Sequence, residues 1–176
     1  PESDRMRYYL GREYMYKGEW QMCIDTLKYY LDMPNSLRSE ERCAAMRWIA
    51  RSYDNLNNPD LACVWYFKAI AEAPHMREPY IEFAQLCYKY GDYSMVYFLT
   101  EEALKIKEKS KTFVNMGYAW DHTPYDLAGI AAYNIGLMEK AYSYMLKAYE
   151  IAPGDERLEK NYFFIKNLLE KSAASN

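Results

Sequence analysis

The sequence predicts an all-α fold, a right-handed superhelical solenoid of four helical hairpins followed by a C-terminal capping helix. The main evidence is a pattern of small and large residues that returns four times along the 176-residue chain. Its most regular position holds a glycine or an alanine, at Gly11, Ala50, Ala84 and Gly129. These positions are 39, 34 and 45 residues apart, and a repeat near 34 residues indicates stacked helical hairpins.

The small residues explain how the two helices of a hairpin approach each other. Antiparallel helices cross closely only where side chains are small, and large residues three or four positions away fill the remaining space. Three hairpins carry a glycine between their helices, at Gly18, Gly91 and Gly136. Glycine readily adopts the left-handed conformation that ends a helix, so these positions predict the turns.

The repeat also predicts the domain organisation. We expect a single domain, residues 1–176, in which an insertion at 107–121 separates the third hairpin from the fourth and a helix at 155–171 closes the array. The hairpins are expected at about residues 4–34, 43–74, 77–107 and 122–153. In the last of them, Thr123 is the expected N-cap and Pro124 the first helical residue.

The pattern resembles the tetratricopeptide repeat (TPR) family, whose repeat is 34 residues long. The resemblance covers about residues 4–154, and the copy from Ala44 to Pro74 matches best. Two positions depart from the family pattern, with Tyr30 in place of an alanine and Glu108 in place of a proline. The resemblance implies a chain that works by recognising a partner rather than by catalysis.

Composition excludes several classes of function. A net charge of −3 gives no general electrostatic attraction to nucleic acid. No apolar run approaches the roughly 20 residues that a membrane-spanning helix needs, and no signal peptide is recognisable. We therefore expect a cytoplasmic protein, and because the chain begins with Pro1 rather than Met we expect a fragment or a processed chain.

The cysteines and histidines indicate neither a metal site nor a cofactor. Cys23, Cys43, Cys63 and Cys87 form no CxxC pair, which favours free, buried thiols in a reducing compartment. His75 and His122 each stand alone. No cofactor is expected.

The insertion carries a second, more particular resemblance. The stretch from Ala119 to Ala128, followed by Ala132-Tyr133-Asn134-Ile135-Gly136, is similar to part of the C-terminal TPR region of bacterial family-2 glycosyltransferases. The discriminating element runs from Trp120 through Pro124, Tyr125 and Asp126, and no Asp-x-Asp metal motif of a catalytic domain is present. The resemblance implies an accessory module. The residues of this insertion element are Trp120, Asp121, His122, Tyr125 and Asp126.

A candidate ligand-binding face follows from the TPR resemblance, because the first helices of TPR hairpins line a concave surface. Arginine binds carboxylates and phosphates through its planar fork, and aromatic rings add stacking area. The same mapping also places Glu82 and Ile130 on this face. The predicted groove residues are Arg5, Tyr8, Tyr9, Arg12, Arg47, Trp48, Arg51, Asn55, Gln85, Tyr88, Lys89, Tyr133 and Asn134.

Two simpler interpretations stay open at this point. The arginines of the face can pair with neighbouring acids such as Glu13, Glu41 and Asp54 and bind no ligand. The aromatic residues of the insertion, Phe113 and Trp120 among them, can pack into a neighbouring hairpin.

Independent catalysis is not expected, and no catalytic residue is predicted. Asp121, His122 and Asp126 form a compact acid/base cluster, but no nucleophile or phosphate-binding loop accompanies it. N-capping and an ordinary ion pair explain the cluster equally well. His122 and Asp126 are four residues apart and could hydrogen-bond at the start of a helix.

The sequence supports two main hypotheses of function. The first is a non-catalytic TPR scaffold, the accessory module of a glycosyltransferase, which holds an acceptor or mediates dimerisation. The alternative is a free-standing adaptor that binds an acidic peptide in the arginine-rich groove. A weaker third option is sugar binding through exposed tyrosines and Trp48.

Overall fold

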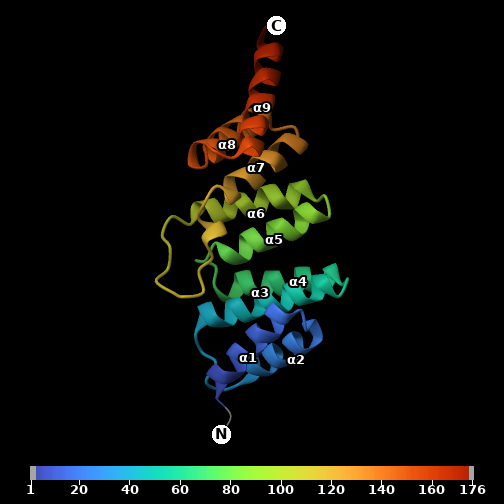
Figure 1. Cartoon of the computed structure of the whole chain (residues 1–176), viewed down its shortest axis with the longest axis vertical. Helices are drawn as coiled ribbons and strands as arrows, with labels where there is room; N and C mark the ends of the chain where they lie inside the picture. The colour runs from blue at the N-terminus through green and yellow to red at the C-terminus, as the bar shows by residue number, and fades with distance from the viewer. Residues whose placement is uncertain (1–2, 175–176) are drawn as a thin grey trace. The chain divides into compact units, whose positions relative to one another are not determined.

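The computed structural model describes residues 3–174. Within this range it contains nine α-helices, one short 3-10 helix and no β-strand, which confirms the all-α prediction (Figure 1). Within the hairpins α1–α2, α3–α4 and α7–α8 the two helices run antiparallel (Figure 1). The α-helices are α1 (Asp4–Lys17), α2 (Trp20–Asp32), α3 (Ser39–Asn55), α4 (Pro59–Glu72), α5 (Glu78–Lys89), α6 (Tyr93–Lys105), α7 (Thr123–Asn134), α8 (Met138–Ile151) and α9 (Glu156–Ala174).

The chain divides into two compact units, which are described separately. Unit 1 consists of Pro1–Glu82 and Glu108–Asn115, and unit 2 consists of Phe83–Lys107 and Met116–Asn176. Unit 1 therefore holds α1 to α4 and the first residues of α5. Unit 2 holds the rest of α5 and α6 to α9. The expectation of a single domain stays a prediction.

The turns inside the hairpins lie where the sequence predicts them. Gly18 ends α1 with a φ of 73°, and its backbone N–H donates to the carbonyl oxygen of Met15 at 3.2 Å. Gly91 and Gly136 also have positive φ, 77° and 83°. In the second hairpin Asn57 adopts the left-handed conformation instead, with a φ of 57°. Asparagine tolerates this region better than most residues, so each hairpin turns by the same means.

The closest helix crossings also lie at the predicted small residues. A Cβ atom added to Gly129 would lie 2.8 Å from Cγ and 3.2 Å from the backbone nitrogen of Met145. One added to Gly11 would lie 2.3 Å from a methyl carbon of Leu27. Both hairpins therefore pack helix against helix with no space for a side chain at the crossing.

An aromatic cluster forms the centre of the unit 1 core. The ring of Tyr8 on α1 lies 5.4 Å from that of Tyr30 on α2 and 5.2 Å from that of Trp48 on α3, measured between centroids. Met76, which follows α4, and Val114 from the insertion belong to the same buried cluster. The core thus joins three helices to a segment more than thirty residues further along the chain.

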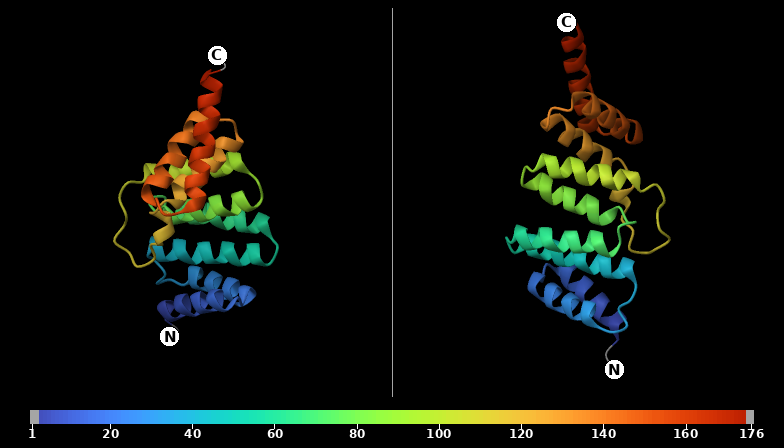
Figure 2. Two further views of the ribbon diagram at one scale, coloured as in Figure 1. Left: turned by 45° about the horizontal axis from the view of Figure 1, so that its top comes forward. Right: turned by 180° about the vertical axis from the view of Figure 1, so that it is seen from behind.

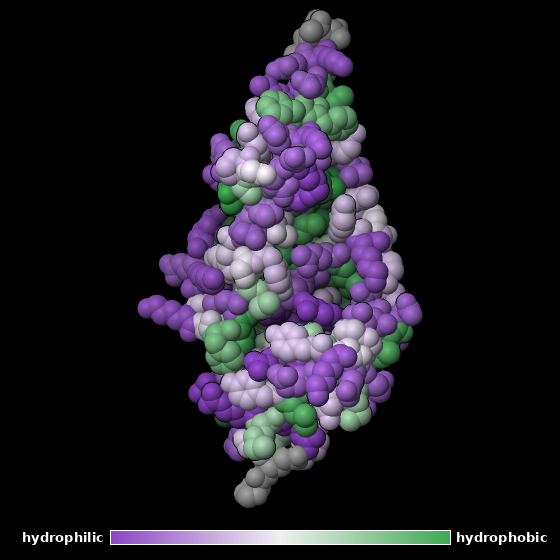
Figure 3. All heavy atoms as spheres, viewed as in Figure 1, coloured by the Kyte–Doolittle hydropathy of each residue, from purple (hydrophilic) through white to green (hydrophobic). Residues whose placement is uncertain are grey.

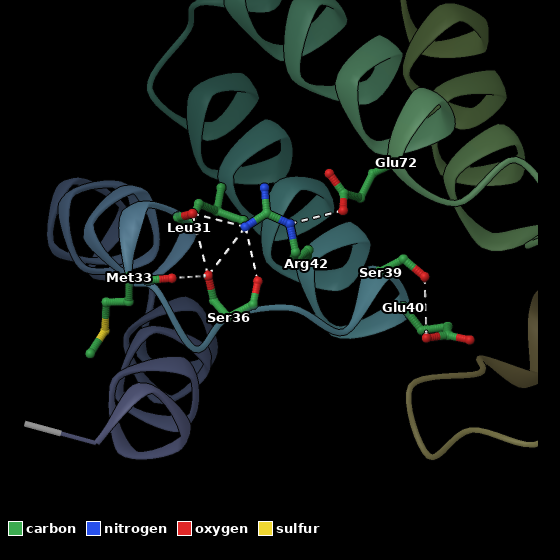
Figure 4. Close-up of polar contacts among 7 residues, drawn as sticks. All are labelled: Leu31, Met33, Ser36, Ser39, Glu40, Arg42 and Glu72. Atoms are coloured by element: carbon green, nitrogen blue, oxygen red, sulfur yellow. Dashed lines mark hydrogen bonds and ion pairs between the residues drawn. The ribbon is translucent and has the colours of Figure 1, made fainter.

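The connection between α2 and α3 is held by one arginine (Figure 4). The Nη1 group of Arg42 donates to the carbonyl oxygens of Leu31 at 2.8 Å and Ser36 at 3.1 Å, and Nε donates to Glu72 at 2.8 Å. The bond to Leu31 satisfies a carbonyl that the end of α2 leaves without a helical partner, and the bond to Ser36 ties the following loop to α3. The helix α3 begins at Ser39, four residues before the expected boundary at 43, so Arg42 lies inside its first turn.

The last helix of the chain packs on the hairpin formed by α7 and α8. Tyr162 and Ile165 of α9 join Met145 of α8 in a buried cluster, and the rings of Tyr149 and Tyr162 stack 5.5 Å apart at 4°. The carboxylate of Asp155 caps α9 by accepting the backbone N–H of the third residue of the helix at 3.2 Å. A helix that follows the fourth hairpin was predicted, and α9 occupies this place.

The insertion before α7 is partly packed and partly exposed (Figure 2). Val114 is 6% exposed within unit 1, whereas the neighbouring Phe113 is 58% exposed. In unit 2 the 3-10 helix Gly117–Ala119 contains Tyr118 and is followed directly by Trp120. Both aromatic side chains are half-buried. The packing interpretation therefore describes Tyr118 and Trp120 but does not describe Phe113.

Among the described residues no helix has the length and hydropathy needed to cross a bilayer. None of the four cysteines, all of which lie among the described residues, forms a disulfide. Cys23, Cys43 and Cys87 are buried, and Cys63 is half-buried. Burial raises the pKa of Cys23 to about 11 and of Cys43 to about 12, so these two thiols stay protonated at neutral pH.

Candidate functional site

Three of the predicted groove residues in unit 1 lie in its interior. Tyr8 and Arg47 are each 1% exposed, and Trp48 is 9% exposed. Burial raises the pKa of the Tyr8 hydroxyl, with the carboxylate of Glu41 as the next contribution. These side chains shape the wall of the predicted face from inside and present almost no surface to a ligand.

The buried guanidinium of Arg47 is paired with an acid from the next hairpin. Its Nη2 atom lies 2.5 Å from Oε1 of Glu82, a residue of α5 that is also buried. The same carboxylate oxygen lies 3.5 Å from the guanidinium of Arg51, whose side chain is 38% exposed. Two of the four predicted arginines are therefore engaged with one acid within unit 1.

The remaining two arginines pack on a tyrosine at the start of the chain. The guanidinium carbon of Arg12 lies 4.8 Å from the centre of the Tyr9 ring, and that of Arg5 lies 5.7 Å from it. Arg12 also pairs with Glu13 at 3.2 Å, as the simpler interpretation of the face expected. Arg5 is exposed and borders a polar pocket of about 250 Å³. That pocket is lined by Asp4, Arg5, Tyr30, Asn35, Leu37, Arg38 and Glu41.

The predicted amide groups are bound to their own helices. The side-chain nitrogen of Asn55 donates to the carbonyl oxygen of Arg51 at 2.9 Å, and that of Asn134 donates to Ile130 at 2.8 Å. Gln85 and Lys89 of α5 are exposed, and the Lys89 ammonium lies 5.1 Å from the centre of the Tyr90 ring.

A second candidate site is a groove in unit 2 with a volume of about 300 Å³. Helices α5, α7, α8 and α9 all contribute to it, and most of its lining is apolar. Tyr88 and Tyr133 belong to the predicted groove residues, and Ile130 was mapped to the same face. The described lining residues are Tyr88, Ile130, Tyr133, Met145, Arg157, Asn161 and Phe164.

One side of this groove is a stripe along α9 that the sequence analysis did not assign. Arg157, Asn161 and Phe164 follow one another at intervals of four and three residues, so they share one face of the helix. The Phe164 ring meets the Tyr133 ring edge to face, with centroids 5.6 Å apart. The helical periodicity of these three residues was the available signal, but we expected α9 only to close the array.

An ion pair fixes the charged end of the stripe. The Nη1 atom of Arg157 lies 3.0 Å from Oδ1 and 2.8 Å from Oδ2 of Asp126 on α7. The Asp126 side chain is 11% exposed and that of Arg157 is 54% exposed. Burial raises the pKa of Asp126, and the attraction of Arg157 opposes this rise. Nη1 contacts both carboxylate oxygens, and the Arg157 side chain also lines the groove.

The insertion element starts a helix and places one acid beside the groove. Oδ1 of Asp121 accepts the backbone N–H of Thr123 at 2.7 Å. The expected cap is wrong by one residue, because His122 is the N-cap and Thr123 is already helical. The carboxylate of Asp126 binds Arg157. Tyr125 packs near Tyr144, and Trp120 is half-buried.

Comparison with known proteins identifies the fold. The chain matches no protein-family model and no curated protein sequence. Solved structures do match. MamA from residue 41 onward, from Desulfovibrio magneticus RS-1, has a TM-score of 0.73 at 15% identity and covers 99% of this chain and 91% of its own.

Two further structures support the same conclusion. PilF of Pseudomonas aeruginosa has a TM-score of 0.65 at 14% identity, over 94% of this chain and 66% of its own. The TPR-like repeats of a Podospora anserina kinesin light chain have a TM-score of 0.59 at 15% identity, over 98% and 99%. The fold is a TPR-like solenoid. The fold class predicted from the repeat is confirmed.

Proposed function

We propose that the chain is a non-catalytic scaffold that binds an extended segment of a partner protein in the groove of unit 2. The observation that carries the proposal is the groove itself. Two exposed tyrosines, Tyr88 and Tyr133, line it together with Phe164, whose ring contacts that of Tyr133, and Arg157 and Asn161 add polar groups to the lining. Aromatic rings with polar ends are the side chains that protein interfaces favour, because they add contact area at a low cost in conformational entropy.

The experiment that tests the proposal is selection from a random peptide library displayed on phage. We expect enriched peptides whose binding is lost in the variant Tyr88→Ala/Tyr133→Ala. The control is Tyr16→Ala, which removes a tyrosine of unit 1 that is more exposed, at 66%, than Tyr88 at 43% or Tyr133 at 37%. Selected peptides that bind the double variant as tightly as the native chain would contradict the proposal.

The accessory role in a glycosyltransferase is a finer part of this proposal. It is supported by the sequence resemblance of the element from Trp120 to Asp126, with its partner a catalytic domain in the same polypeptide or a second copy of the chain. Sequencing the reading frame upstream of Pro1 tests the first possibility. Sedimentation of the native chain against Phe113→Ser, which changes an exposed side chain of the insertion and leaves Val114 in the unit 1 core, tests the second. An upstream frame without a transferase domain, together with identical sedimentation, would remove this role.

The acidic-peptide adaptor is the second candidate. Arg5 and Arg12, stacked on Tyr9, favour it because their guanidinium groups reach the surface of unit 1. Arg47 and Arg51 support it less, since both engage Glu82. We expect Arg5→Ala/Arg12→Ala to weaken the binding of a poly-glutamate peptide and to flatten its salt dependence. Binding unaffected by these two changes would exclude it.

A further inference from the structure

The stripe on α9 combines three kinds of group in a fixed order. Arg157 offers a cation, Asn161 an amide, and Phe164 an aromatic ring, all facing one groove. On the molecular face drawn in Figure 3, hydrophobic side chains reach the surface over α9, and Phe164 is 51% exposed. A ligand that fills this groove therefore needs an acceptor at one end and an apolar group at the other.

The cation retains donors for a ligand although it is paired. Arginine carries five N–H donors in a planar fork, and the bonds to Asp126 both use Nη1. The other edge of the fork, Nε and Nη2, belongs to a side chain that is 54% exposed and lines the groove. Among the described lining residues Arg157 is the one that carries a full charge. A carboxylate is the ligand group that matches such a fork.

The spacing of the stripe sets the length of the ligand. Arg157 and Phe164 are seven residues apart on a helix, which corresponds to about 10 Å along its axis. An extended peptide covers this distance in about three residues. Asn161 lies between them, and its amide can donate to and accept from one peptide unit of the extended chain.

We propose that the groove of unit 2 recognises an extended peptide in which an acidic residue lies about three positions from a large apolar residue. The carboxylate binds the free N–H groups of Arg157, the intervening backbone binds Asn161, and the apolar side chain packs against the paired rings of Tyr133 and Phe164. This inference rests on the proposed function and adds the sequence class of the partner.

The test uses synthetic Gly/Ser peptides with capped ends that carry one Asp and one Phe. We compare Asp and Phe adjacent, about three positions apart and about six positions apart, measuring affinity by fluorescence anisotropy. The peptide with the middle spacing should bind at least about tenfold more tightly than its Asp→Asn counterpart. This comparison changes the peptide alone, so it needs no protein variant to fold.

A double-mutant cycle then assigns the carboxylate to its arginine. With Arg157→Gln, the preference for Asp over Asn in the peptide should disappear, because the two changes remove the same contact. Lys160→Ala is the matched control, since it removes an exposed cation from the same helix and should leave the preference intact. A cycle without coupling, or equal affinity at all three spacings, would overturn the inference.

A failure of this inference can be distinguished from a failure of the proposed function. Groove-dependent peptides from the library that carry no acid would overturn the acid-and-spacing rule while the scaffold function stands. Tight binding only by peptides with a free C-terminal carboxylate beside Phe would overturn it as well. A library in which no peptide depends on Tyr88 and Tyr133 would overturn both.

Discussion

The two units use the same ion-pair chemistry in opposite ways. In unit 1 the partners Arg47 and Glu82 are both 1% exposed, so the pair is closed to any ligand. In unit 2 the acid Asp126 is 11% exposed and Arg157 is 54% exposed. A buried acid that holds a half-exposed arginine orients the cation while leaving it able to bind. Exposure of the cation, rather than its presence, distinguishes a structural pair from a recognition site.

The largest effect on stability is expected from breaking the buried ion pair of Arg47 and Glu82. Arg47→Ala should lower the free energy of unfolding by about 3 kcal/mol, because it removes the 2.5 Å contact to the buried carboxylate of Glu82, and the contact of that carboxylate to Arg51 is longer, at 3.5 Å. Urea denaturation measures this loss. The double change Arg47→Met/Glu82→Leu removes both charges and should be markedly less destabilising. Equal losses in the single and double variants would show that the pair is not the source of the effect.

A smaller effect is expected from the helix crossings. Gly129→Ala should destabilise by about 2 kcal/mol, because the new methyl group meets both the side chain and the backbone nitrogen of Met145. Gly11→Ala should destabilise the chain less than Gly129→Ala does. The three atoms nearest to its new methyl group all belong to the Leu27 side chain, Cδ2 at 2.3 Å and Cγ at 2.5 Å among them, and a side chain shifts more readily than a backbone atom. Thermal unfolding of the two variants compares their losses of stability. A larger loss for Gly11→Ala than for Gly129→Ala would contradict the prediction.

The smallest effect is expected from opening the exposed pair, and it depends on pH. The raised pKa of Asp126 means that the folded chain keeps this proton to a higher pH than the unfolded chain. The contribution of Asp126 to the free energy of unfolding therefore falls as the pH rises above the ordinary aspartate pKa of about 3.9. Arg157→Gln removes the attraction that opposes this rise in pKa. The loss of unfolding free energy between low pH and pH 7 should therefore become larger, by less than about 1 kcal/mol.

Urea denaturation at several pH values between about 4 and 7 checks this prediction against the aspartate pKa. In Asp126→Asn the pH dependence from this group should vanish, with or without Arg157. Parallel pH profiles for the native chain and Arg157→Gln would show that the arginine does not act on this carboxylate.

The repeat pattern was sufficient to predict the fold because it depends on local geometry. Gly18, Gly91 and Gly136 are each required by a turn, and Gly129 by a crossing, so their positions indicate where helices end and meet. These requirements involve neighbours in sequence or in the same hairpin, and they can be recognised without coordinates.

The candidate site was only partly predictable because exposure depends on distant partners. Its position in the TPR-like repeat places Arg47 on the predicted ligand-binding face, but α3 is buried along the whole stretch from Cys43 to Ala50. Its partner Glu82 lies 35 residues away. The stripe on α9 was missed for the converse reason. A closing helix was expected to face solvent, whereas Arg157 and Phe164 form one wall of a groove.

The place of Val114 in the unit 1 core has a consequence for biosynthesis. The ribosome completes α1 to α4 and reaches Glu82 roughly thirty residues before it adds Val114. At about 5–20 residues per second this interval lasts a few seconds, during which the nascent hairpins expose the apolar patch that Val114 later covers. Unit 1 therefore cannot finish folding in the order in which it is translated, and its completion waits for a segment made after α6.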